Sequence, residues 1–323
     1  MFVVKQYKKE YKQEWDSFVK TAKNATFLFQ RDFMDYHSDR FEDFSLMVYK
    51  GDKLYALLPA NKKGNNVISH QGLTYGSFVL QDSAKLFYSF NAFKKVLEFL
   101  YNEEIKKLDM RVIPSFYNNV PSDELEYILF KANAKTIKSD VILLIDYKNP
   151  LSFIKSRRQA IRRGAKNNLI IKIEDNYNDF WNTILIPNMY NKYKVKPIHS
   201  LNEIKELASK FPENIKQFNV YKDEELVAGS TIFITKTTIH PQYISANIEK
   251  NTLESLDFLY NHIINLYKDE KSFFDFNTSS EDSGNLINKG IIFWKESFGA
   301  RPHIVNNYLV ETSAYKTLEI KTT

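Results

Sequence analysis

A lysine among aromatic residues is the strongest chemical candidate in this sequence. Lys295 follows Phe293 and Trp294 and precedes Phe298. These neighbours predict a largely buried helix, in which the ammonium would be held away from water. A positioned ammonium can stabilise a developing oxyanion or neutralise a phosphate. The alternative is an ordinary helix lysine in solvent, and we predict that Lys295 is catalytic.

A carboxylate between two aromatic residues is the second catalytic candidate. Asp275 stands between Phe274 and Phe276 in a segment that predicts a parallel strand. Alternation along a strand places it on the face opposite both rings. A carboxylate in a dry site has a raised pKa, which suits it to accept a proton from an attacking amine. It would equally serve as a structural hydrogen-bond acceptor, and proton transfer assisted by the substrate would need no side-chain base.

A run of basic residues near the middle of the chain is a candidate anion site. No acid occurs between Tyr147 and Ile173, and a predicted helix there carries Lys155, Arg157, Arg158, Arg162, Arg163 and Lys166. Arg158, Arg162 and Lys166 recur at a spacing of four, where like charges repel by about 0.2–0.5 kcal/mol per pair. Cofactor phosphates, RNA or a substrate diphosphate would relieve this repulsion. The alternative is a solvated helix face that pairs with acids from elsewhere.

Weaker binding candidates come from strand ends, a loop and the first half of the chain. Open α/β sheets place ligands at strand ends, and an aromatic and basic loop suits a nucleotide base and phosphate. Ordinary packing is the alternative for any of the 20 tyrosines, and a structural role is the alternative for each histidine. Beside Arg158 and Arg162, the predicted substrate-binding residues are Tyr193 and Lys196 in the loop, Tyr243 and Asn247 at a central strand end, and His37, His70 and Tyr75 in the first half.

Several kinds of site have no counterpart in the sequence. The chain has no cysteine, which removes disulfides and thiolate chemistry, and its six histidines show no metal-ligand spacing. We therefore predict no metal. The phosphate loop of nucleotide-hydrolysing enzymes, the dinucleotide glycine motif and the nucleophile elbow of hydrolases have no match either, so kinase, dehydrogenase and hydrolase functions are disfavoured.

Composition places the chain among globular proteins. Its 323 residues are 43% hydrophobic, enough for two domains of ordinary size. The net charge of +6 favours anionic partners, although scattered surface lysines would give the same value without any ligand. No segment has the roughly 20 apolar residues that span a bilayer, and the first residues do not resemble a signal peptide. We expect a soluble cytoplasmic protein.

An internal repeat predicts the fold. The hairpin segment 48–56 aligns without gaps with 220–228, and the helix segment 97–102 aligns with 256–261. A strand, a helix, a strand, a helix and a final strand follow each hairpin in the same order, and the last helix of the second copy is predicted over 286–298. This order predicts an α/β fold of two tandem modules with mixed sheets. Pro150 follows Asn149 at the start of the basic helix, so we place the domains at 1–149 and 150–323.

The residues above resemble those of a known family, the Fem aminoacyltransferases and their FemABX-like relatives with tandem GNAT-type domains. The similar stretches are Phe274–Ser280, Phe293–Ala300, the basic run and the turn Gly72–Gly76. The resemblance spans nearly the whole chain. It implies an enzyme that transfers an acyl or aminoacyl group to an amine in a cleft between two GNAT-like domains. The acceptor in such enzymes is commonly attached to a nucleotide or lipid diphosphate.

Two departures from the family bear on the acyl donor. The chain has no heptad segment that would form a long helical arm, and Arg162–Ala165 only weakly resembles the GNAT pyrophosphate motif. The leading hypothesis is an N-acyltransferase that uses acetyl-CoA and a nucleotide-linked amino sugar or another small cell-envelope glycan precursor, as in polysaccharide biosynthesis. The first alternative adds an amino acid from aminoacyl-tRNA to a peptidoglycan precursor. The second is a non-catalytic nucleotide- or RNA-binding module, and no hypothesis involves DNA.

The two modules are not expected to share the work equally. Lys295, Asp275 and the basic helix all lie in the second copy. We therefore expect the second domain to hold the catalytic and phosphate-binding residues, and the first domain to form the acceptor side of the cleft. The last strand, near the end of the sequence, is expected to pack back on the first domain.

Overall fold

The computed structural model describes residues 1–321, and for Tyr193 only the backbone. The chain forms two compact units. The first contains Met1–Asp140, Asp282–Asn285 and the residues from Ile304 onward, and the second contains Val141–Glu281 and Leu286–His303. The boundary predicted at Asn149–Pro150 therefore lies within the second unit, because the chain enters that unit's sheet before it reaches the proline.

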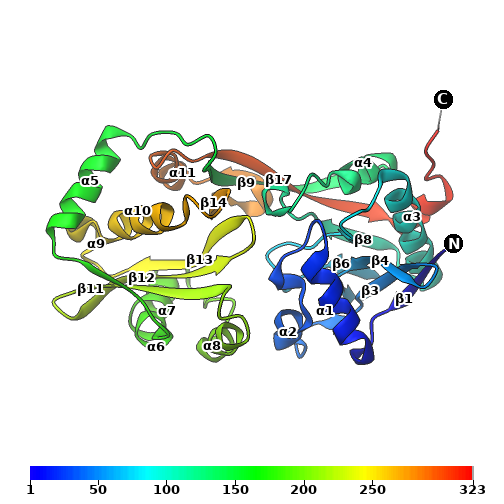
Figure 1. The fold of residues 1–323 in the computed structure, drawn as a ribbon, viewed down its shortest axis with the longest axis horizontal. Helices are drawn as coiled ribbons and strands as arrows, with labels where there is room; N and C mark the ends of the chain where they lie inside the picture. Colours follow the sequence, from blue (N-terminus) through cyan, green and yellow to red (C-terminus); the bar gives the residue numbers. More distant parts are fainter. Residues whose placement is uncertain (322–323) are drawn as a thin grey trace. The chain divides into compact units, whose positions relative to one another are not determined.

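The first unit is built from two sheets and two longer helices (Figure 1). One sheet has the strand order β1-β3-β4-β7, and the strands β17-β8-β6-β5-β2 follow one another in the other. The elements are β1 Phe2–Gln6, α1 Lys12–Thr21, α2 Arg31–Met34, β2 Glu42–Asp43, β3 Leu46–Lys50, β4 Lys53–Leu58, β5 Asn61–Lys63, β6 Asn66–Ser69, β7 Val79–Leu80, α3 Leu86–Asn102, β8 Lys107–Arg111, α4 Glu124–Lys131 and the first part of β9 Lys135–Asp146.

The second unit places helices on both faces of one mixed sheet. Its strands follow the order β10-β11-β12-β13-β14-β9. Figure 1 shows α10 and α11 on one face and α6, α7 and α8 on the other. The elements are α5 Lys155–Lys166, β10 Ile170–Ile173, α6 Tyr177–Asp179, a π-helical stretch Phe180–Leu185, α7 Ile186–Tyr193, α8 Leu201–Lys210, β11 Ile215–Lys222, β12 Glu225–Ile234, β13 Thr238–Ala246, α9 Lys250–Leu253, α10 Ser255–Tyr267, β14 Phe273–Thr278, β15 Ser280–Glu281, β16 Leu286–Ile287 and α11 Lys289–Glu296. The strand β17 Arg301–Glu311 begins in this unit and belongs to the first unit from Ile304 onward.

Hydrophobic periodicity explains why these segments form these elements. In α10 the residues Leu259, Tyr260, Ile263 and Ile264 recur at helical spacing and are buried against the sheet. In β14 the alternating Phe274 and Phe276 enter the same core, and α3 packs its apolar face into the core of the first unit in the same way. Each unit thus has a hydrophobic core of its own.

The internal repeat is present in the structure down to a local irregularity. In the first hairpin the pairing of β3 with β4 shifts register between Val48 and Tyr49. In the second hairpin the pairing of β11 with β12 shifts between Val220 and Tyr221, at the aligned positions. Both hairpins therefore contain a β-bulge at the same place, which increases the local twist of the strands.

The final strands do not follow the repeat. The segment Ile142–Asp146 of β9, which ends the first copy in the sequence, pairs antiparallel with β14 of the second unit. The segment Asn307–Glu311 of β17, which ends the second copy, pairs antiparallel with β8 of the first unit. The order of elements is repeated, but the last strands are exchanged.

One predicted helix is shorter than expected. The sequence predicted a helix over 286–298, whereas Leu286 and Ile287 form β16 and the helix α11 begins at Lys289. The side chain of Asn288 accepts a hydrogen bond from the Ile291 N–H at 3.1 Å and so caps the helix. The apolar residues Leu286 and Ile287 fit a helical pattern in the sequence, but they lie on a short exposed strand. The helix begins only after its cap, Asn288.

Candidate functional site

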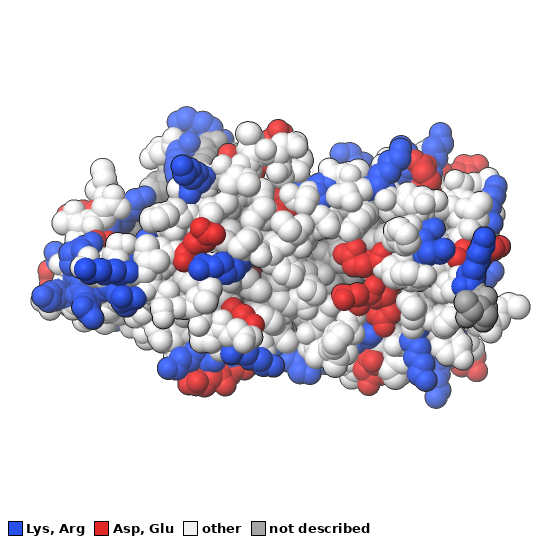
Figure 2. Space-filling model, turned by 90° about the horizontal axis from the view of Figure 1, so that it is seen from above, with Lys and Arg blue, Asp and Glu red and all other residues white. Residues whose placement is uncertain are grey.

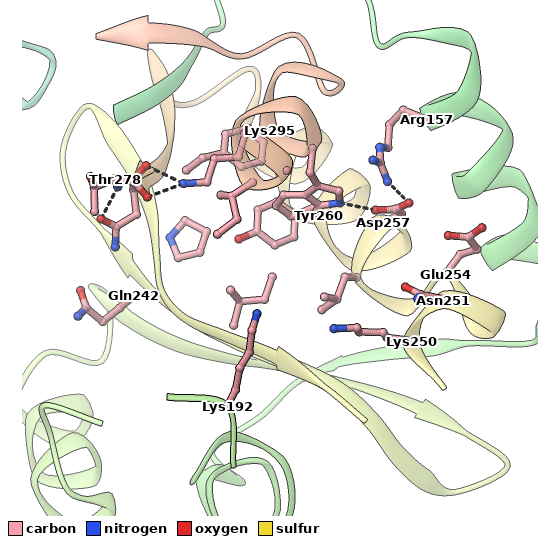
Figure 3. A pocket seen from close by; sticks show the side chains of 18 residues that line it. Arg157, Lys192, Gln242, Lys250, Asn251, Glu254, Asp257, Tyr260, Thr278 and Lys295 are labelled. Carbon is pink, nitrogen blue, oxygen red and sulfur yellow. Dashed lines mark hydrogen bonds and ion pairs between the residues drawn. The ribbon is translucent and has the colours of Figure 1, made fainter. Parts of the chain in front are cut away.

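A cavity of about 660 Å³ lies in the second unit, at the point where two parallel strands diverge (Figure 3). The pairing of β13 with β14 joins Thr238 to Phe273 and Ile239 to Phe274. Residues beyond this pairing line the cavity, with α10 and α11 covering it and Arg157 and Lys192 reaching it from α5 and α7. From the two strands these residues are Pro241, Gln242 and Ile244 of β13 and Phe276, Asn277 and Thr278 of β14.

A β-bulge in β13 explains why the strands open here. Thr231 of β12 faces Tyr243, whereas the next residue, Ile232, faces Pro241, so Gln242 is an extra residue in β13. A bulge bends its strand, and a proline has no N–H to donate to a neighbouring strand. Together they end regular pairing beside β14 and leave Gln242 on the wall of the cavity.

Lys295 lies on the side of this cavity formed by α11. Its side chain is 5% exposed, and its Nζ donates hydrogen bonds to the carbonyl oxygens of Asn277 and Thr278, both at 2.8 Å. The ammonium thus binds the end of β14, where Asn277 has a left-handed φ of 65°. A lysine ammonium has three N–H bonds, so one remains for a ligand in the cavity.

Burial makes Lys295 easier to deprotonate than an ordinary lysine. Loss of solvation lowers its pKa from 10.5 to about 8, and the negative charge of Asp275 opposes this shift. At neutral pH the ammonium form still predominates. The helix around it is less buried than its aromatic residues predicted, because Phe293 is 61% exposed.

The cavity wall as a whole carries a surplus of positive charge. Four cationic side chains, Arg157, Lys192, Lys250 and Lys295, face two carboxylates, Glu254 and Asp257. The formal surplus is two positive charges when Lys295 is protonated. Figure 3 shows Gln242, Thr278 and Lys295 toward one end of the cavity and Lys250, Asn251 and Glu254 toward the other. The charge favours an anionic ligand.

Arg157 fastens α5 to the cavity wall. Its guanidinium pairs with Asp257, its Nε donates to Ser297 Oγ at 2.8 Å, and its centre lies 4.8 Å from the ring of Phe298. Asp257 also accepts a hydrogen bond from Trp294 Nε1 at 2.9 Å. These contacts join α5, α10 and α11, so Arg157 positions helices.

The other arginines of the basic run point elsewhere. Arg158 and Arg162, predicted to bind substrate, are exposed and do not line the cavity. The buried face of α5 is formed instead by Ala160 and Gly164, and a Cβ at Gly164 would lie 3.1 Å from Phe258 Cβ on α10. Figure 2 shows Lys and Arg side chains gathered over the end of the second unit where α5 lies.

Asp275 is buried on the face of the sheet opposite the two phenylalanines, as alternation predicted. Its Oδ2 lies 2.8 Å from His240 Nδ1, and its Oδ1 accepts a hydrogen bond from the Asn277 N–H at 2.6 Å. It does not line the cavity, although its charge raises the pKa of Lys295 against the larger effect of burial. A direct role as base is thus less well supported than an indirect electrostatic one.

Three further binding candidates lie outside the cavity, and a fourth, Tyr193, has a side chain that the structure does not describe. Tyr243 is buried, with its hydroxyl 2.6 Å from His199 Nδ1 and its ring packed on Trp181. Asn247 accepts a hydrogen bond from the Glu249 N–H and stabilises the turn before α9. Lys196 is exposed in the segment between α7 and α8, and the side chain of Tyr193 lies outside the described part of the structure. None of the three described side chains lines the cavity.

The three candidates in the first unit form a buried group of their own. The rings of His37 and His70 are 5.4 Å apart, and the Tyr75 hydroxyl lies 2.9 Å from Thr26 Oγ1. Burial lowers the pKa of His70 to about 3, and the neighbouring His37 acts in the same direction. His70 is therefore neutral at physiological pH. None of these residues belongs to the cavity in the second unit, and their role as acceptor ligands stays a prediction.

Sequence reasoning missed several residues that line the cavity, notably Gln242, Lys192, Lys250 and Asp257. Lysines are frequent in this chain, so their types carried no signal. A signal did exist for Gln242, because Pro241 interrupts an otherwise regular strand pattern and a proline inside a strand often marks a bulge. No motif pointed to Asp257, whose partners Arg157 and Trp294 come from two separate segments.

No protein-family model and no curated protein sequence matches the chain. Solved structures do resemble it. The crystal structure of FemX superposes with a TM-score of 0.65 at 11% identity, over 98% of this chain and 99% of that chain. The C-terminal domain of a putative lysylphosphatidylglycerol synthetase from Agrobacterium fabrum gives 0.56 at 13% identity, over 82% and 83%.

A tandem GNAT protein from the clavulanic acid biosynthesis pathway gives a TM-score of 0.50 at 10% identity, over 97% of this chain and 99% of that chain. At such identities the likeness concerns the fold. None of the helices in the described residues 1–321 is long and apolar enough to cross a membrane. The chain has the mixed α/β fold with two GNAT-like modules that its sequence predicted.

Proposed function

We propose that the second unit is an N-acyltransferase that acts in the cavity between the diverging strands β13 and β14. The observation that carries this proposal is Lys295, a buried ammonium that keeps one N–H bond for a ligand at the mouth of the opened sheet. The fold likeness to FemX and to a tandem GNAT protein supports it. The chain also resembles the C-terminal domain of a putative lysylphosphatidylglycerol synthetase.

The reaction would join an amine to an activated carbonyl. The amine nitrogen attacks the carbonyl carbon, the C–N bond forms, and the carbonyl oxygen becomes an oxyanion. When the oxyanion collapses, the bond to the leaving oxygen or sulfur breaks, and the leaving group takes up the proton that the amine loses. An ammonium held by two carbonyl oxygens is already positioned to stabilise the oxyanion, so it need not reorganise during the reaction.

We propose that the acceptor carries negative charge. Lys192 and Lys250 both line the cavity, and both side chains are drawn toward its interior in Figure 3. A nucleotide-linked amino sugar or another small precursor of the cell envelope has an amine together with phosphates. Phosphates suit the surplus positive charge of the wall.

The donor has two candidates. The first is an acyl thioester such as acetyl-CoA. In that case the diphosphate would have to bind near the N-terminus of α10, where helix N–H groups attract anions. Glu254 and Asp257 already stand at this terminus, and their partners are Arg163 and Arg157.

Glu254 and Asp257 neutralise Arg163 and Arg157, so these arginines offer a diphosphate no surplus positive charge at the start of α10. This observation favours the second candidate, aminoacyl-tRNA. Its ester links an amino acid directly to the terminal ribose, so no diphosphate has to bind at α10. The acceptor would then be a peptidoglycan precursor with a free amine.

The test is a transfer assay with both donors in parallel. The protein is incubated with labelled acetyl-CoA or with tRNA charged with labelled amino acids, and with a panel of nucleotide-linked amino sugars and peptidoglycan precursors. Label transferred to an amine by the wild type, and lost in Lys295→Met, supports the proposal. Binding of nucleotide or RNA without transfer from either donor would instead identify a non-catalytic binding module.

A further inference from the structure

Tyr260 of α10 lines the cavity, and no step proposed above uses it. Its side chain is 2% exposed, yet its hydroxyl forms no hydrogen bond with any residue that the structure describes. Buried tyrosine hydroxyls usually have a hydrogen-bond partner, because enclosing one without a partner is costly. An unpaired hydroxyl on the wall of a cavity therefore indicates a partner that a ligand supplies.

Four aromatic rings hold the ring of Tyr260 in place. The ring of Phe276 stacks on it at a centroid distance of 5.3 Å, and the ring of Trp294 meets it edge to face at 4.9 Å. The centroids of Phe274 and Phe298 lie 5.6 Å and 6.0 Å from it. Close packing on this scale leaves a side chain few alternative rotamers. The direction of the hydroxyl is therefore fixed before any ligand binds.

That direction relates the hydroxyl to the proposed reaction. Figure 3 shows the hydroxyl of Tyr260 directed toward the end of the cavity where Thr278 and Lys295 lie, and away from Lys250 and Asn251. The proposed reaction places the carbonyl oxygen of the acyl donor at Lys295. The substituent on that carbonyl carbon then lies at the same end of the cavity as the hydroxyl.

Apolar side chains surround the ring of Tyr260. Phe276 and Trp294 line the cavity beside it, and so does Leu256, one helical turn earlier on α10. The indole N–H of Trp294 is already donated to Asp257. In such surroundings a hydroxyl strongly affects selectivity, because a site built to form a hydrogen bond rejects an analogue that lacks the partner group.

The hydroxyl of Tyr260 keeps its proton. Burial raises the pKa of Tyr260, and the negative charge of Asp275 acts in the same direction. A neutral hydroxyl both donates and accepts hydrogen bonds, so it can pair with an amine or with another hydroxyl. An alkyl group offers it no partner, and the binding of such a group would separate the hydroxyl from water without a replacement.

We propose that Tyr260 is a specificity-determining residue, whose hydroxyl forms a hydrogen bond with an amine or hydroxyl on the carbon next to the reacting carbonyl. The site thereby prefers acyl groups with such a substituent to plain alkyl groups such as acetyl. The inference rests on the proposed acyl transfer. It concerns the group that is transferred, whether the carrier is a tRNA or a thioester.

The first experiment compares three acyl groups with the same three-carbon skeleton. Alanyl carries an amine next to the carbonyl, lactyl carries a hydroxyl there, and propionyl carries neither. Each is loaded on the carrier that supports transfer, and kcat/KM is measured with one acceptor and the full-length protein. For the wild type we expect alanyl and lactyl to exceed propionyl by about 10–10²-fold. In Tyr260→Phe this ratio should fall close to one, because only the substituted groups lose a partner.

Two results would overturn the role of Tyr260 while acyl transfer stands. One is a ratio that Tyr260→Phe leaves unchanged. The other is an equal loss of kcat/KM for all three groups, because the hydroxyl would then act on the carbonyl, the leaving group or the acceptor, which the three reactions share. Absence of transfer by the wild type with every group on either carrier would instead reject the proposed function, and the specificity role with it.

The second experiment tests without any substrate whether the hydroxyl of Tyr260 has a partner in the protein. The matched control is Tyr147 in the same unit, whose hydroxyl donates to the Ile264 carbonyl oxygen at 2.9 Å. Tyr147→Phe loses this bond and should lower Tm without changing the acyl-group ratio, whereas Tyr260→Phe should keep the wild-type Tm or exceed it. A Tm of Tyr260→Phe as low as that of Tyr147→Phe would overturn the proposal, because the hydroxyl would then stabilise the fold.

Discussion

Lys295 combines two properties that compete in most lysines. It is buried, which lowers its pKa, and it still donates two hydrogen bonds to backbone carbonyls at the end of β14. The carbonyl dipoles and the charge of Asp275 offset part of the lost solvation. The ammonium is therefore fixed before any ligand binds, which is the condition for effective electrostatic catalysis.

Removing the charge of Lys295 is expected to affect activity more than stability. Lys295→Met should lower kcat by about 10²–10³-fold, the typical effect of losing one oxyanion donor. It should also cost about 1–3 kcal/mol of stability, because two partly buried carbonyl oxygens lose their donor. Lys295→Gln keeps an N–H donor without the charge and separates the two effects. Steady-state kinetics and thermal unfolding of both variants measure them, and full activity in Lys295→Gln would contradict an electrostatic role.

The lowered pKa of Lys295 predicts opposite trends for activity and stability in alkaline solution. Activity should fall as the pH rises through about 8, because the ammonium loses its proton. Between about 8 and the ordinary value of 10.5 the unfolded chain binds more protons at this residue than the folded protein does. The contribution of Lys295 to the free energy of unfolding therefore increases with pH in that window.

A pH series checks both trends. The kcat profile of the wild type is compared with that of Lys295→Arg, whose guanidinium stays protonated and whose residual activity should not show the alkaline fall. Urea unfolding of the wild type and of Lys295→Met gives the stability difference at each pH. An alkaline limb that persists in Lys295→Arg would assign the titration to another group.

At the level of single residues, the sequence predicted the candidate catalytic residue Lys295 better than it predicted the substrate-binding residues. Lys295 was predicted from its type and aromatic neighbours, and the structure places it on a cavity wall. Arg158 and Arg162 were preferred to Arg157 because of their spacing. Spacing reports which residues share a helix face, but only packing against α10 decides which face is buried. The role of Asp257 depends on Arg157 and Trp294, distant in sequence, and no local pattern encodes that.

Among the elements, α5 is attached to α10 by a buried ion pair and by close packing of the two helices. Arg157 reaches Asp257 on α10 and Ser297 beyond α11, while Gly164 lets α5 approach α10 closely. Asp257 is 5% exposed, so its charge is stable there only with its partner. The contacts of Arg157 and Asp257 that attach α5 thus also form part of the cavity wall.

Substitution of Arg157 should therefore be far more damaging than substitution of a neighbour on the same helix. Arg157→Ala leaves a buried carboxylate without its ion pair, and the expected cost is about 3–5 kcal/mol. Arg162→Ala removes an exposed side chain and should change stability by less than about 0.5 kcal/mol. Thermal unfolding of the two variants makes the comparison. Equal shifts in Tm would show that Arg157 does not hold α5 in place.

The prediction of whole elements succeeded where the sequence contains a repeat. Both hairpins and the order of helices and strands are as predicted, because alternation and helical periodicity are local properties. The start of α11 was misplaced, since Asn288 caps the helix within an apolar stretch. The partner of the last strand in each copy is a non-local property. The repeat alone would pair β9 with its own copy, whereas β9 pairs antiparallel with β14 of the second copy.

For the whole molecule, the exchange of last strands means that the end of the sequence stabilises the unit at its beginning. Val310 of β17 and Leu318 are buried in the core of the first unit, and the Thr312 hydroxyl donates to the Ile105 carbonyl oxygen at 2.6 Å. The first unit is complete only when the second copy has been synthesised. Each unit thus depends on a strand from the other copy in the sequence.

Truncation of a buried side chain in β17 should accordingly destabilise the first unit. Val310→Ala removes two buried methyl groups and should cost about 2 kcal/mol, whereas Ile304→Ala, at a half-exposed position of the same strand, should cost much less. Hydrogen exchange followed by mass spectrometry locates the effect. In Val310→Ala we expect faster exchange in β6, β8 and α3, with β11–β13 unchanged, because the pairing partner of this segment is β8. Faster exchange confined to the second unit would contradict the exchanged pairing, since the mutated residue would then belong to the wrong core.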